Sequence, residues 1–271
     1  MLQAENVLFT AVLIGYFALT GLNFVLAIGK NEKLFRFASL LQGGILILHT
    51  LALILRGIGA GRWPMTNQYE FAVSFAWALC LVSLFFIRKY QFPLLGVFSS
   101  PLILLMIGYA AMQNREVREL MPSLRSSWLA FHVSTAIIAY GSFGVAMILS
   151  LIFLFRGKMK EDRFWGQHVP QPEKLDQISY RSVSLGMLFL TLTMLTGAIW
   201  AEQAWGSYWS WDPKETWSLI TWIIYAVYLH LRLRKGWQGR AAAWFAVVGF
   251  ICVIFTYLGV NTFLPGIHSY A

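Results

Sequence analysis

Residues 127–155 read SWLAFHVSTAIIAYGSFGVAMILSLIFLF and contain no Asp, Glu, Lys or Arg. The run exceeds the 20 or so apolar residues with which a helix crosses a hydrocarbon layer of roughly 30 Å. Across the whole chain, 58% of residues are hydrophobic and 12% charged, against roughly a quarter charged in soluble domains. Further apolar runs lie on both sides of this one, so lipid is the main solvent of the chain.

Lipid offers no hydrogen-bond partners for backbone groups, so each apolar run must be helical. We therefore predict an all-α, polytopic membrane helix bundle that forms a single membrane domain over residues 1–271. About eight transmembrane helices are expected, at approximately residues 7–28, 37–56, 69–87, 92–112, 127–155, 181–201, 215–233 and 241–260. The long polar connection, about 156–180, contains two prolines and is expected to be a loop.

The net charge of +9 reflects basic residues in the short connections between apolar runs. This pattern is typical of membrane topology, and we expect no nucleic-acid partner. Placing residues 29–36, 88–91, 156–181 and 232–240 on one side collects fifteen of the 21 Lys and Arg residues there. The positive-inside rule then predicts an inner loop at about 156–180 and both termini on the outer, periplasmic side.

Tryptophan is concentrated in residues 200–222, which hold six of the twelve tryptophans of the chain. An aromatic belt at the membrane surface would explain one or two per helix end. It does not explain four between Trp200 and Trp211, interleaved with Gly206, Ser207 and Ser210. Indole rings give broad apolar faces. An external tryptophan-rich loop at about 200–217 would therefore suit a flat macrocycle such as haem.

Asp212, Pro213, Lys214 and Glu215 follow this cluster directly. Asp as N-cap, Pro at the first helical position and Glu at the third predict a helix start. A charge contact from Asp212 or Glu215 to a ligand remains an alternative. Lys214 is either a contact for an anionic group such as a propionate or an ordinary interfacial lysine.

Ionisable side chains in membrane spans are functional candidates by default. Topology places His132 and His268 on the outer side, at the depth of the tryptophan loop. Two imidazoles beside an aromatic slot would suit axial ligation of a haem iron; alternatively, each bonds a neighbouring helix. His230, near the inner end of its span, is a snorkelling residue or a functional one. His49, in the second span, contacts substrate or pairs with another helix.

Several segments together resemble the CcsA/ResC family of System II cytochrome c biogenesis, which belongs to the tryptophan-rich, WWD-motif group of haem-handling membrane proteins. The most specific is WGSYWSWDPKETW at 205–217. The others are PMTNQYEFAVSFAW at 64–77, SWLAFHVSTAIIAYGSF at 127–143, YAVYLHLR at 225–232 and GVNTFLPGIHSYA at 259–271. The resemblance covers essentially the whole chain.

The resemblance implies haem transport to the outer membrane face and thioether attachment of haem b to the CxxCH motif of apocytochrome c. His132 and His268 map to the family's axial ligands, and the walls of the haem site would be Trp205, Trp209, Trp211, Asp212 and Trp217. His230 maps to an inner transit site, to which His49 is a further candidate contributor. No side chain is implied as nucleophile or base.

The implied activity is that of a holocytochrome c synthase, or haem lyase. It is expected only with a CcsB/ResB-type partner, because the chain lacks the CcsB-like half of fused family members. The implied location is a bacterial inner membrane, or a thylakoid membrane if the chain is plastid-encoded. The alternative is a non-enzymatic haem-binding membrane protein or a regulator of haem biosynthesis.

Overall fold

The computed structural model describes residues 2–29, 32–117, 119–160, 164–264 and 266, and the regular structure within those ranges is entirely helical. The chain divides into two compact units. Unit 1 comprises residues 1–117 and 160–170, and unit 2 comprises residues 118–159 and 171–271.

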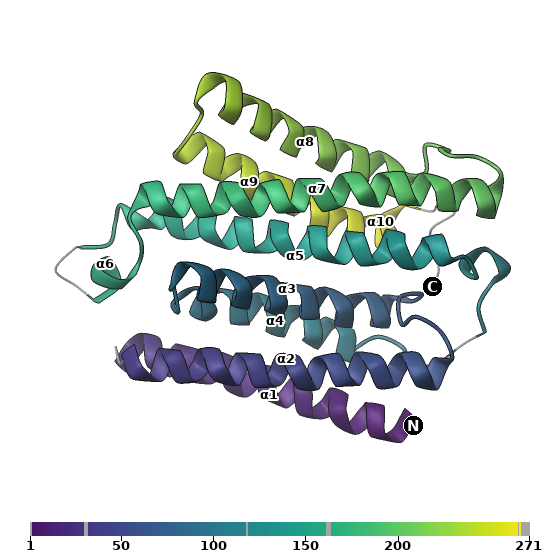
Figure 1. The fold of residues 1–271 in the computed structure, drawn as a ribbon, viewed down its shortest axis with the longest axis horizontal. Coiled ribbons are helices and arrows are strands. Elements are labelled where there is room, and N and C mark those ends of the chain that lie inside the picture. Colours follow the sequence, from purple (N-terminus) through teal and green to yellow (C-terminus); the bar gives the residue numbers. More distant parts are fainter. Residues whose placement is uncertain (1, 30–31, 118, 161–163, 265, 267–271) are drawn as a thin grey trace. The chain divides into compact units, whose positions relative to one another are not determined.

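Unit 1 is a bundle of four long helices and one short one: α1 (Leu2–Gly29), α2 (Glu32–Ala60), α3 (Gln68–Tyr90), α4 (Leu95–Ala111) and α6 (Phe164–His168). Helices α1 and α3 each pack against both α2 and α4 (Figure 1). The side chain of Asn67 caps α3 by accepting a hydrogen bond from the Glu70 N–H. Phe164 of α6 stacks on Phe35 of α2, with ring centroids 6.0 Å apart.

Unit 2 contains η1 (Pro122–Leu124), α5 (Ser127–Arg156), α7 (Pro172–Trp205), α8 (Pro213–Lys235), α9 (Arg240–Ile254), the π-helix η2 (Phe255–Gly259) and α10 (Val260–Phe263). Helices α5 and α7 pack against each other (Figure 1), and serines of both helices lie at their contact. The Ser182 hydroxyl donates to the Ser142 carbonyl at 2.7 Å, and the Ser150 and Ser179 hydroxyls are 2.9 Å apart. Small residues let backbones approach, as is common between membrane helices.

Two stacked aromatic rings join α8 and α9 to this pair. Phe143 of α5 and Tyr225 of α8 stack with centroids 3.8 Å apart and planes 4° from parallel. Gly186 of α7 lies against the Phe143 ring, and Gly249 of α9 lies against the Tyr225 ring. The absence of a side chain at both glycines therefore makes room for the stack.

The all-helical membrane bundle predicted from the sequence is confirmed. Among the described residues, six helices are long and apolar enough to cross a membrane: Gln3–Gly29, Leu34–Ala60, Gln68–Tyr90, Ser127–Arg156, Pro172–Trp205 and Arg240–Phe263. Helix α4 is apolar but shorter. Helix α8 is 23 residues long but is not among these six helices, and it carries the charged residues Glu215, Arg232, Arg234 and Lys235 in its first and last turns. The count of eight spans and the outer location of the termini stay predictions.

Two connections are more helical than the sequence analysis expects. Within residues 156–180 the chain forms α6 and the first turns of α7. Helix α7 begins at Pro172 with Glu173 in its first turn, a sequence that favours a helix start. At its other end α7 continues through Trp205, until Gly206 adopts a left-handed φ of 72°.

The surfaces of unit 1 fit a lipid environment. On α1, Phe17 and Phe24 are 68% and 67% exposed, whereas Asn23 is buried. The Asn23 amide donates to the Gly96 carbonyl and the Ser100 hydroxyl of α4. Apolar rings thus face outward and a polar group is satisfied between helices, as a solvent without hydrogen-bonding capacity requires.

The stack in unit 2 predicts that Gly249→Ala is destabilising. An added Cβ would lie 2.5–2.9 Å from three Tyr225 ring atoms, and overpacking of this kind costs about 1–3 kcal/mol. Thermal unfolding in detergent should show a lower midpoint for this variant. Gly44→Ala is the control, because nothing lies within 4 Å of a Cβ added there. An equal midpoint for the two variants would contradict the role of Gly249.

Candidate functional site

His132 lies in the second turn of α5, and its ring packs flat against α7. Its Nδ1 is 2.9 Å from the Thr193 carbonyl oxygen. A Cβ on Gly197 would lie within 3 Å of the ring. The indole of Trp200 stacks on the same imidazole, with centroids 5.9 Å apart and planes 24° from parallel. Positions 193, 197 and 200 follow a helical spacing, so one face of α7 holds the ring.

The contact with Thr193 determines which nitrogen of His132 carries the proton. A carbonyl oxygen only accepts, so Nδ1–H must be the donor. The neutral imidazole then has its lone pair on Nε2. Metal-binding histidines are commonly oriented in this way by a second partner. In its neutral form His132 therefore has the tautomer of an Nε2 ligand.

Trp200 continues the aromatic surface from His132 toward the end of α7. It is 1% exposed, and its Nε1–H donates to the Ser123 carbonyl of η1 at 2.9 Å. Trp205 meets it edge-on, with centroids 4.8 Å apart. The part played by Thr193, Gly197 and Trp200 around His132 was not predicted from the sequence. Their shared helix face was the signal that could have shown it.

The segment after Gly206 carries Trp209 and Trp211, which meet edge to face with centroids 5.8 Å apart. The predicted helix start that follows is confirmed. Asp212 accepts from the Lys214 N–H at 2.9 Å and also from the Glu215 N–H. The Glu215 carboxylate accepts in return from the Asp212 N–H at 3.2 Å, which completes a capping box.

The first turns of α8 also contact the C-terminal part of unit 2. Trp217 packs on Phe255 of η2, with centroids 4.3 Å apart. A Cβ on Gly266 would overlap the Asp212 carboxylate and approach Pro213. The backbone at Gly266 therefore lies against the N-terminus of α8. His268, the second predicted axial ligand, lies outside the described residues.

Lys214 is half-buried beside Asp212, just before the predicted seventh span. Burial lowers its pKa to about 8, although the nearby Asp212 carboxylate acts in the opposite direction. The Lys214 side chain is therefore mostly protonated and positively charged at neutral pH, and it loses its proton at mildly alkaline pH. An anionic ligand would favour its charged form.

The other two candidate histidines lie in different units. His49 is completely buried in unit 1, where the Tyr16 hydroxyl of α1 lies 3.1 Å from its Nδ1. It thus pairs with another helix, one of the alternatives that the sequence leaves open. His230 is exposed on α8. Two residues further along α8, Arg232 forms an ion pair with Asp176 near the start of α7.

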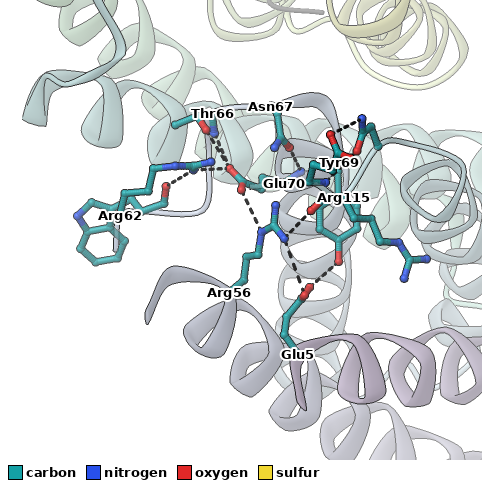
Figure 2. Close-up of polar contacts among 11 residues, drawn as sticks. Glu5, Arg56, Arg62, Thr66, Asn67, Tyr69, Glu70 and Arg115 are labelled. Atoms are coloured by element: carbon teal, nitrogen blue, oxygen red, sulfur yellow. Dashed lines mark hydrogen bonds and ion pairs between the residues drawn. The ribbon is translucent and has the colours of Figure 1, made fainter. Parts of the chain in front are cut away.

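Unit 1 contains a buried charge cluster that the sequence analysis did not anticipate (Figure 2). The Arg56 Nε and Arg62 Nη1 donate to the two oxygens of Glu70, at 3.1 and 2.7 Å. The Tyr69 hydroxyl donates to Glu5 at 2.7 Å, and an Arg56 Nη1 lies 3.8 Å from the second Glu5 oxygen. Helices α1, α2 and α3 are thereby joined at one end of the unit.

The cluster is structural rather than a ligand site. The cavity beside it has a volume of about 10 Å³, enough for a single water molecule. Arg56 also donates to the Arg115 carbonyl at 2.8 Å. The Arg115 guanidinium rests on Phe9, 4.2 Å from the ring centroid. The cluster therefore fixes the segment that follows α4 as well as the three helices.

Comparison with known proteins reveals similarity over most of the chain. The sequence model of a family described as cytochrome C assembly protein matches residues 65–268. The cytochrome c biogenesis protein CcsA of Prochlorococcus marinus (strain MIT 9515) is 38% identical over 285 residues, covering 96% of this chain and 91% of the relative. CcsA of Chlamydomonas reinhardtii is 39% identical over 259 residues, covering 92% of this chain and 72% of the relative.

A solved structure shares the fold. The cytochrome c heme lyase CcmF matches 93% of this chain with a TM-score of 0.71 and 15% identity. The match covers 46% of that longer chain, so this chain spans about half of it. At this identity the likeness concerns the fold alone.

The charge cluster predicts that Glu70→Gln strongly destabilises unit 1. The substitution leaves Arg56 and Arg62 with Glu5 as the remaining carboxylate of the cluster, and an uncompensated buried charge costs about 3–5 kcal/mol. Thermal unfolding in detergent should show a large fall in the midpoint. Glu116→Gln is the control, because Glu116 is an exposed glutamate of the same unit. Equal midpoints would show that the ion pairs contribute little.

Proposed function

Because this chain belongs to the cytochrome C assembly protein family, we propose that it is the haem-handling subunit of a System II cytochrome c synthase. In this proposal it carries haem b to the outer face of the membrane and presents it to the CxxCH motif of apocytochrome c. A CcsB/ResB-type subunit completes the enzyme. The membrane is a bacterial inner membrane or, for a plastid-encoded chain, the thylakoid.

The observation that carries the proposal is the setting of His132. Its Nδ1–H is held by Thr193, and Trp200 lies against its ring, so the imidazole is presented as an Nε2 donor beside aromatic surface. We assign His132 and His268 as the axial ligands. Trp205, Trp209, Trp211, Asp212 and Trp217 form the walls in this assignment. The family match covers residues 65–268 and therefore includes all of these positions.

Thioether formation requires that the haem vinyl groups be positioned next to the cysteine thiols; it does not require a protein nucleophile. Each thioether forms when a cysteine thiol adds across a vinyl group: the S–H and C=C π bonds break, and S–C and C–H bonds form. No net oxidant is consumed. Holding the two vinyl groups against two thiols makes the step effectively intramolecular, for which orientation alone gives large rate gains.

We assign His230 to the inner part of the path along which haem crosses the membrane. Its exposure on α8 supports a transit site completed by a histidine of the partner subunit. His49 is a weaker candidate for such a site, because it is fully buried against Tyr16 and lies before the family match.

The axial assignment is tested in the complex with a CcsB-type partner and a reporter cytochrome c. His132→Gly and His268→Gly should each lower bound haem and cytochrome maturation by more than about tenfold, and added imidazole should restore part of both. Absorption spectra and covalent haem staining measure the two quantities. His168→Gly is the control, since its Nδ1 also lies near a backbone carbonyl, that of Phe164, but in unit 1.

Gly197→Ala is a companion variant that leaves His132 in place. The added methyl group would overlap the imidazole and should reduce haem binding without imidazole rescue. Normal haem in both histidine variants would refute the axial pair. Haem binding without any thioether formation in the complete complex would instead favour a non-enzymatic haem-binding protein or a regulator.

The charge of Lys214 predicts a pH dependence of haem binding. If Lys214 contacts a propionate, haem affinity should fall as pH rises from 7 to 9, because a group of pKa about 8 loses most of its charge over that range. Lys214→Arg should keep its affinity at pH 9, and Lys214→Met should be weak at both values. Haem dimethyl ester, which lacks propionate charge, is the ligand control. The same pH dependence for haem in Lys214→Met would exclude this contact.

A further inference from the structure

Glu215 makes more contacts than a helix cap needs. One of its oxygens, Oε2, accepts from the Asp212 N–H at 3.2 Å, which is the capping contact. The same oxygen accepts from the Ser210 N–H at 2.8 Å and lies 3.1 Å from the Ser210 hydroxyl, which also donates to it. Ser210 lies outside the helix, so Glu215 holds the loop itself as well as the start of α8.

The residue between these two anchored positions is Trp211, and its backbone is strained. Its φ is 59°, a left-handed value that is unusual for a bulky side chain. Such a conformation costs of order 1–3 kcal/mol and persists only where the surroundings hold it. The Glu215 carboxylate binds the N–H groups on either side of Trp211 and supplies this restraint.

The conformation has a consequence for the indole of Trp211. The side chain is 68% exposed, although it is large and apolar. Its ring stands at 89° to that of Trp209. The Thr216 hydroxyl donates to the backbone carbonyl of Trp211 at 3.3 Å. The restraint thus keeps an apolar ring face open instead of letting the loop fold over it.

We propose that Glu215 is a positioning residue, whose carboxylate holds Trp211 in its left-handed conformation so that the indole is available as a wall for a flat ligand. The identification of that ligand as haem rests on the proposed function; the restraint on the loop does not. Helix capping and site organisation are then two roles of one carboxylate.

The loop is tested first, by hydrogen exchange of the protein alone in detergent. In Glu215→Gln and Glu215→Ala, the Ser210 and Asp212 amides should exchange about tenfold faster or more, because a hydrogen bond to a charged acceptor contributes about 1.5–3 kcal/mol. Amides in the middle of α8 should exchange at the wild-type rate. Glu202→Gln, at the end of α7, is the matched carboxylate control. Unchanged exchange at both amides would overturn the proposal.

The link to the ligand is tested by a double-variant cycle in the complex with the partner. Glu215→Gln and Trp211→Gly should each weaken haem binding and shift the haem absorption bands. Glu215→Gln should add nothing in the Trp211→Gly background, because the wall that it positions is already gone. Fully additive effects would show that Glu215 does not act through Trp211.

The two proposals can fail separately. Wild-type complex without haem would refute the proposed function, while the exchange measurement would still report on Glu215. Wild-type complex with haem, together with Glu215 variants that match it in exchange and in haem spectrum, would refute only the role of Glu215.

Discussion

The close approach of His132 to α7 at Gly197 is the constraint on which the tryptophan-rich end of unit 2 depends. A side chain at position 197 would occupy the space of the imidazole. Without one, the ring reaches the Thr193 carbonyl and the Trp200 indole. Trp200 in turn reaches Ser123 and Trp205. One missing methyl group therefore allows the histidine, two tryptophans and the start of α5 to share a single packed surface.

Polar groups elsewhere in the chain are also constrained by their surroundings. Lipid cannot satisfy them, so they pair between helices. Neutral groups do so along α5 and α7, where serine hydroxyls meet backbone carbonyls. Charged groups do so at one end of unit 1, where Glu70 receives two guanidinium groups. Buried ion pairs are weak sources of net stability, and here they specify which helix ends meet.

Glu215 shows why a local explanation and a functional one need not compete. The sequence around Asp212 predicts a helix start, and the capping box confirms it. The contacts to Ser210 extend that cap backward into the loop and across the strained Trp211. A residue that begins a helix can therefore also set the geometry of the loop before it.

The sequence by itself determined the helical membrane architecture, the family and the capping box at α8. These follow from local rules: apolar length, a specific motif and residue order at a helix start. Residue order left the contacts of His132 undecided, because Thr193 and Gly197 are about sixty residues away along the chain. Likewise, it did not show that His49 is buried and His230 exposed, or that Glu5, Arg56 and Glu70 meet. Only tertiary packing decided these, since it sets which face of each helix meets another helix and which meets lipid.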